Sequence, residues 1–182
     1  MLQITIPGIE LWDEENGQFV STKETTLNLE HSLLSLSKWE SKWNKAFLSR
    51  ENQTLEETRS YIRCMTLNKN VDPEVYKCLS GQNIKEVQDY IAAPMTATHF
   101  SQLQERRGGF YKETVTSELI YYWMVALGIP FECQKWHLNR LITLIKICNI
   151  KNTPPKKMSK NEIAARNAQL NAARRAKLHS KG

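Results

Sequence analysis

The stretch SELIYYWMVALGIPFECQKWHLNRLITLIKICN, residues 117–149, determines the predicted fold. Its first part, SELIYYWMVALG, is apolar on almost every side of a helix and predicts a buried helix at the centre of the body. Ile129–Pro130 then breaks the chain, because proline cannot continue a helix. The second part, QKWHLNRLITLIKICN, predicts a helix that packs against the first as an αα-hairpin.

Further helices are predicted before this stretch. HSLLSLSKWESKWNKAFL (31–48) places its apolar residues at helical spacing, with lysines on other faces. Thr54 followed by Glu57 is a capping-box pattern and predicts a helix start at LEETRSYIRCMTL. Asp72–Pro73 predicts the start of a short helix that ends at Ser80–Gly81, and NIKEVQDYIA predicts another helix.

Two segments predict β-hairpins. Residues 2–11 and 18–29 favour extended structure, and WDEENG between them supplies turn residues. Pro7 cannot donate a ladder hydrogen bond, so the first strand should lie at an edge or bend there. PMTATHF (94–100) and FYKETVT (110–116) predict a second hairpin around SQLQERRGG. The predicted fold class is α+β, mainly α-helical, with an N-terminal β-hairpin, a helical core and a C-terminal basic helix.

The positive charge of the chain is concentrated at its C-terminal end. The formal net charge is +6 and the pI is about 9.1. Eight of the 25 basic residues but one of the 19 acidic ones follow Pro155, which leaves residues 1–155 with a net charge of −1. Such a balanced body argues against a broad nucleic-acid-binding face on it. We therefore predict a globular body at 1–153 and a Pro-Pro linker with a basic helical tail at 154–182.

Composition predicts a protein of a reducing, aqueous compartment. The hydrophobic fraction of 41% suits a packed domain. We expect no disulfide framework and no cleavable signal, because the cysteines are scattered through apolar contexts and the N-terminus lacks the pattern of a signal. No apolar run reaches the roughly 20 residues that cross a bilayer, so we expect no membrane partner and a cytoplasmic location.

Cys133 and His137 give a weak signal of site chemistry. Their spacing of four would put a thiol and an imidazole on one side of a helix, as in a zinc site or beside a thiolate nucleophile. However, no C-x-x-C or H-x-x-x-H pair completes a zinc ligand set, and no glycine-rich phosphate motif is present in the sequence. We therefore predict no catalytic residue, no metal and no cofactor, and we do not expect an enzyme.

Aromatic residues form the first candidate surface for a partner. Trp39, Trp43 and Phe47 lie on an amphipathic stripe with lysines nearby, which suits a partner groove. The aromatic run at 121–123 and the tryptophan pair could instead stack on nucleic-acid bases, and such stripes most often belong to the core. We predict Trp39, Trp43 and Phe47 as partner-binding residues.

The basic tail forms the second candidate surface. Ser159 and Glu162 form a capping box that should start an alanine-rich helix. Its apolar stripe of Ile163, Leu170 and Leu178 is thin, so the helix should project from the body. Its cations could grip nucleic-acid phosphates, could bind an acidic or amphipathic helix, or could only aid solubility. The residues predicted to contact a partner are Arg166, Arg174, Arg175 and Lys177.

Several segments of the sequence resemble those of a known protein family. The segments LEHSLLSLSKWESKWNKAFL, YIRCMTL, NVDPEVY, APMTATHF, ELIYYWM and FECQKWHLNRLITLIKICNIKN, followed by PPKKMSK, are similar to tail assembly chaperones that tailed phages and prophages encode near the tape-measure gene. The likeness runs from Leu2 to Lys181–Gly182. It implies a non-enzymatic protein of the host cytoplasm that binds the tape measure protein and recruits the major tail protein during tail morphogenesis.

Two other functions fit the same residues. The first is a phage regulator that binds RNA or DNA through the basic C-terminal helix. The second is a structural tail component that stays in the virion. A homo-oligomer is compatible with all three functions.

Overall fold

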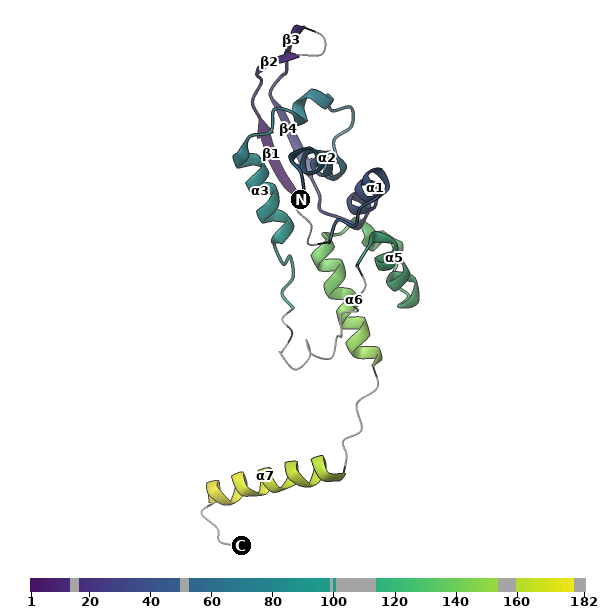
Figure 1. The fold of residues 1–182 in the computed structure, drawn as a ribbon. Coiled ribbons are helices and arrows are strands. Elements are labelled where there is room, and N and C mark those ends of the chain that lie inside the picture. The colour runs from purple at the N-terminus through teal and green to yellow at the C-terminus, as the bar shows by residue number, and fades with distance from the viewer. Residues whose placement is uncertain (14–16, 50–52, 99, 101–113, 154–159, 179–182) are drawn as a thin grey trace. The chain divides into compact units, whose positions relative to one another are not determined.

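The computed structural model describes residues 1–13, 17–49, 53–98, 100, 114–153 and 160–178. The chain divides into two units, Met1–Ile150 and Lys151–Gly182. The first unit combines a β-hairpin with several helices, and the second contains a long helix (Figure 1). The fold class is therefore α+β and mainly α-helical, as the sequence predicts.

The predicted N-terminal β-hairpin is present, and it is interrupted in the middle. Its strands are β1 (Leu2–Ile6), β2 (Glu10–Asp13), β3 (Gln18–Ser21) and β4 (Thr25–Leu29). β1 pairs antiparallel with β4, and β2 pairs antiparallel with β3. Between the two ladders, the Thr22 N–H donates to the Ile9 carbonyl at 2.9 Å, so a single pairing register runs through both.

The interruption lies at Pro7 and Gly8, where the sequence predicts a bend. Pro7 has no N–H to donate to the ladder. At Gly8 the two backbones approach so closely that a Cβ atom would lie 2.7 Å from the Thr22 carbonyl oxygen and 3.0 Å from the Glu24 nitrogen. Only glycine fits at this position without a shift of the backbone.

Gly8→Ala is expected to destabilise the protein by about 1–3 kcal/mol, because the new methyl group must displace backbone atoms. Gly81→Ala is the matched control, since a Cβ there meets nothing within 4 Å and the residue opens a helix. That variant should be neutral or slightly stabilising. Urea unfolding of both variants measures the difference, and equal midpoints would contradict the steric account.

The part of the hairpin formed by β1 and β4 has one buried and one polar face. On the polar face the Gln3 and Asn28 side chains share a hydrogen bond of 2.8 Å. The segment after the second helix extends along β4, where the Leu67 N–H donates to the Asn28 carbonyl at 2.8 Å. The side chains of the buried face are Ile4, Ile6, Leu27 and Leu29.

Helix α1 (Leu33–Trp43) contacts α2 (Leu55–Met65) and α5 (Ser117–Ala126), and so lies at the centre of the helical part. It is shorter than predicted, because Asn44 adopts a left-handed conformation with φ of 52° and ends it. Phe47, predicted within this helix, therefore lies in the following loop. The predicted capping box of Thr54 and Glu57 at the start of α2 is confirmed.

The next two elements are the 3₁₀ helix η1 (Pro73–Tyr76) and α3 (Gly81–Ala92). Asp72 caps η1 by accepting the Glu74 N–H, as Asp72–Pro73 predicts. The predicted helix end at Ser80–Gly81 is wrong. Ser80 is the N-cap of α3, because its hydroxyl accepts the Asn83 N–H and so satisfies a free donor of the first turn.

The predicted second hairpin is wrong where the structure describes it. No strand is present at 94–98, 100 or 114–116, and the rest of the predicted hairpin lies outside the described residues. Met95 has a φ of 49°, a left-handed conformation that interrupts an extended run.

Helices α5 (Ser117–Ala126) and α6 (Leu138–Asn152) lie in the stretch that determines the predicted fold. Two details differ from the prediction. The 3₁₀ helix η2 (Phe131–Lys135) separates them, and α5 packs chiefly against α1, so the predicted αα-hairpin is not its main contact. Tyr122 and Val125 are 64% and 63% exposed, so α5 is not buried all round.

A single hydrophobic core joins the hairpin to these helices. Apart from the hairpin residues, its largest fully buried members are Leu33, Leu36, Trp39, Tyr61, Ile62, Met65, Ile120, Met124 and Leu138.

The second unit contains α7 (Lys160–Leu178), the predicted basic helix. Its predicted cap, Ser159, lies outside the described residues. Over the described part of the chain, no helix combines the length and apolarity needed to cross a membrane.

Candidate interaction site

Two histidines far apart in the sequence meet in the core of the first unit. The ring centroids of His31 and His137 are 5.1 Å apart. The backbones are joined as well, because Ser32 forms a β-bridge with His137 and the Leu138 N–H donates to the His31 carbonyl at 2.7 Å. The start of α1 is thereby attached to the start of α6.

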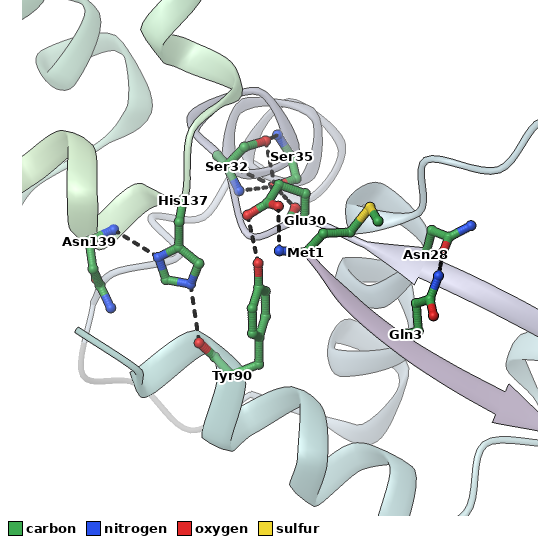
Figure 2. Close-up of polar contacts among 9 residues, drawn as sticks. All are labelled: Met1, Gln3, Asn28, Glu30, Ser32, Ser35, Tyr90, His137 and Asn139. Atoms are coloured by element: carbon green, nitrogen blue, oxygen red, sulfur yellow. Dashed lines mark hydrogen bonds and ion pairs between the residues drawn. The ribbon is translucent and has the colours of Figure 1, made fainter. Parts of the chain in front are cut away.

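His137 is held as a neutral imidazole (Figure 2). Its Nε2 lies 3.1 Å from the Tyr90 carbonyl oxygen, and its Nδ1 lies 3.3 Å from the Asn139 backbone nitrogen. A carbonyl only accepts and a backbone N–H only donates, so the proton of the ring is on Nε2. Burial lowers the pKa of His137, although its bond to Tyr90 acts in the opposite direction.

His31 is neutral for a similar reason. It is 1% exposed, and its Nδ1 shares a hydrogen bond of 2.5 Å with the Tyr61 hydroxyl. Burial, with a smaller contribution from His137, lowers the pKa of His31 to about 3. Burial also raises the pKa of Tyr61. A general base for neutral pH needs a pKa near 7, so His31 is unsuited to that role.

Glu30 completes this polar cluster (Figure 2). One of its carboxylate oxygens accepts from the Tyr90 hydroxyl at 2.7 Å, and the other lies 3.0 Å from the Met1 amino group. Burial raises the pKa of Tyr90, and the hydrogen bond to Glu30 adds to the effect. The cluster therefore joins the end of β4, the C-terminal part of α3 and the start of α6.

Cys133 and His137, whose spacing would put them on one side of a continuous helix, do not share a helix in the structure. Cys133 lies in η2 and His137 precedes α6, because the chain turns between them instead of continuing as one helix. Both side chains are buried. No group of three or more potential metal-ligating side chains occurs among the residues that the structure describes. The contacts of the histidine cluster are those of a structural joint between elements.

The predicted aromatic contact residues lie in or beside the core. Trp39 is 1% exposed, and its indole N–H donates to the Glu57 carbonyl at 2.9 Å. Trp39 therefore has no surface to offer a partner, and its role is in packing α1 on α2. Trp43 and Phe47 are half-buried, and the Phe47 ring stacks on Tyr61 at a centroid distance of 3.9 Å.

Two glutamates hold this aromatic cluster in place. Glu40 is buried, and its two carboxylate oxygens accept from the Phe47 N–H at 2.9 Å and the Ser117 N–H at 2.7 Å. Glu57 accepts from Lys45 at 2.6 Å, and this bond, with the N–H of Thr54, lowers the pKa of Glu57. Glu40 was not predicted as a functional residue, although its place four residues after Leu36 on the apolar stripe was a signal.

The first unit also exposes apolar side chains, two of them on α5, the helix that the sequence predicted as buried. Tyr122 and Val125 of α5 are three residues apart and lie on one side of the helix. Phe131 of η2 is 53% exposed, and its ring centroid is 6.3 Å from that of Tyr121. These residues provide contact area that the core does not use.

The predicted basic contact residues all lie on α7. Every described side chain of this helix is exposed, and the apolar Ile163 and Leu170 remain 46% and 45% exposed. The second unit therefore carries the cations of the predicted site, and the first unit carries the aromatic residues. The basic residues on the surface of α7 include Arg166, Arg174, Arg175 and Lys177.

A scan of the chain against family models finds no match. Comparisons with curated proteins and with solved structures likewise find no match.

Proposed function

We propose that this protein is a phage tail assembly chaperone, a non-enzymatic protein of the host cytoplasm that binds the tape measure protein and tail-tube subunits. The observation that carries the proposal is the exposure of α7. This helix spans 19 residues, and none of its described side chains is buried. A helix gains most of its stability in a protein from packing, so an exposed one is suited to docking on a partner.

The chemistry of the first unit is consistent with this proposal. Its two described histidines, His31 and His137, are neutral and are held by other groups of the protein, while apolar side chains of α5 and η2 face solvent. Exposed apolar area supports contact with another polypeptide. Trp43 and Phe47, which are half-buried, remain candidates for that contact, and Trp39 is no longer one.

Co-expression with tape-measure fragments from the same genome tests the proposal. The full chain is expected to recover a tape-measure fragment in a pull-down, and a chain ending at residue 153 should recover much less of it. A full-length Arg166→Gln, Arg174→Gln, Lys177→Gln variant should show a similar loss, because it removes three of the five basic side chains of α7 and keeps the helix. Equal recovery by all three proteins would remove α7 from the binding account.

The main alternative is binding of RNA or DNA through α7, which the exposed cations favour. A nucleic-acid-binding protein loses affinity steeply as salt is raised, because phosphate contacts release counterions. Titration of the full chain with duplex and hairpin oligonucleotides measures that slope. The second alternative, a tail component retained in the virion, predicts that mass spectrometry finds the protein in purified particles.

A further inference from the structure

The cations of α7 are not spread evenly around the helix. An α-helix turns about 100° per residue, so residues spaced by three, four or seven lie on one side. Leu170 follows Ile163 by seven residues, Arg174 follows Leu170 by four, and Lys177 follows Leu170 by seven. These four residues therefore share one side of α7, which we call the mixed face. Arg166, three residues after Ile163, borders it.

The opposite side of α7 consists mainly of alanine. Its members Ala165, Ala168, Ala172 and Ala176 follow the same spacing of three, four and four. Arg175 lies toward this side, because it is one residue, and so about 100°, away from Arg174. Two adjacent arginines of the same helix therefore point in different directions, one beside Leu170 and one beside the alanines.

The mixed face has the composition of a helix-docking surface. Its two apolar side chains lie one above the other at a spacing of two turns, Arg174 lies about one turn beyond Leu170, and Lys177 lies about one turn further along the same side. In paired helices, apolar residues form the seam and charged residues on its flanks select the partner by charge. Long basic side chains also cover apolar surface with their methylene groups. This arrangement fits a partner with an apolar stripe and carboxylates on its flanks.

Nucleic acid is the weaker fit to the same face. Phosphate binding requires only the cations, and it would leave Ile163 and Leu170 with no apolar group to contact. Their exposure in the free chain, 46% and 45%, costs free energy that an apolar partner surface would recover. The apolar side chains of Ile163 and Leu170 beside the cations therefore favour a polypeptide as the binding partner.

We propose that the mixed face of Ile163, Leu170, Arg174 and Lys177 binds an amphipathic helix of a partner protein, in which two apolar residues about two turns apart are flanked by Asp or Glu. This inference rests on the proposed function and specifies the partner's chemistry. The contact is small, so α7 alone binds weakly and the rest of the chain adds to the affinity.

The direct test uses the full chain and two labelled synthetic peptides. Both peptides are helical, about 20 residues long, with leucines on one stripe. One carries glutamate on the flanks of the stripe and the other carries lysine. In a fluorescence anisotropy titration, the glutamate peptide is expected to bind, and the lysine peptide is not. Binding of the two peptides with equal affinity would overturn the proposal.

Adjacent arginines provide the matched control. Arg174→Gln is expected to weaken binding of the glutamate peptide about threefold to tenfold, and Arg175→Gln less than about twofold. Leu170→Gln should weaken binding similarly, whereas Ala172→Gln on the opposite side should not. Circular dichroism checks that each variant keeps its helix content. Equal losses from Arg174→Gln and Arg175→Gln would show undirected charge attraction and would overturn the mixed face as a site.

A duplex of about 20 base pairs is the third probe. If the duplex binds more tightly than the glutamate peptide and Leu170→Gln leaves duplex binding unchanged, α7 is a nucleic-acid-binding helix and the proposal is wrong. The pull-down of tape-measure fragments is scored separately. Face-dependent peptide binding without tape-measure recovery would keep the mixed face and reject the assignment of its partner. If tape-measure recovery is insensitive to Arg174→Gln and Leu170→Gln, the tape measure protein stays the partner and the mixed face is rejected as its binding site.

Discussion

The protein is expected to lose stability as the pH falls from about 7.5 to 5, by about 2 kcal/mol from His31 alone. In the folded chain the pKa of His31 is about 3, whereas its ordinary value is 6.5. Below pH 6.5 the unfolded chain binds a proton that the folded chain does not. The contribution of His31 is therefore complete above pH 6.5 and is lost as the pH falls toward 3, reaching about 4–5 kcal/mol in total.

Comparison of the wild type with His31→Phe isolates this effect. Phenylalanine keeps a ring in the core and does not titrate, but it removes the bond to Tyr61. The variant should be less stable by about 1 kcal/mol at neutral pH, with a shallower dependence on pH. His137 retains a slope in the same direction, because its pKa is lowered as well. Urea unfolding followed by tryptophan fluorescence measures the free energy of unfolding of both proteins at each pH. If the two free energies changed in parallel with pH, the assignment to His31 would be contradicted.

Glu40→Ala is expected to destabilise the protein by about 3–4 kcal/mol. The substitution removes two hydrogen bonds to a carboxylate, each worth about 1.5–3 kcal/mol, and leaves the N–H groups of Phe47 and Ser117 without an acceptor. Ser117 is the first residue of α5, where a negative charge also interacts favourably with the helix dipole. Amide hydrogen exchange should therefore accelerate in the first turn of α5 and around Phe47.

Two further variants separate charge from packing. Glu40→Gln keeps the shape but presents an NH₂ group to one of the two donors, so a loss of about 2 kcal/mol is expected. Glu86→Ala removes an exposed glutamate of α3 and should change the free energy of unfolding by less than about 0.5 kcal/mol. If Glu40→Ala behaved like Glu86→Ala, the carboxylate would not be the link between α1 and α5.

Local signals predicted a large part of the fold. The Thr54 capping box, the Asp72–Pro73 helix start and the break at Pro7 each act through one or two neighbouring residues, and the structure shows all three. Errors arose where a local signal was ambiguous. A Ser–Gly pair suits either end of a helix, and the β-favouring run around Met95 is overridden by a left-handed residue.

The sequence by itself determined the mainly helical class, the N-terminal hairpin and the basic, alanine-rich helix at the C-terminal end, because these depend on periodicity, propensity and charge within short windows. Only the tertiary structure decided which side chains are accessible. The burial of Trp39, the exposure of Tyr122 and the contact of His31 with His137 depend on elements that meet across long stretches of chain. A helical stripe shows which residues share a side, and only the packed neighbours determine whether that side faces the core or the solvent.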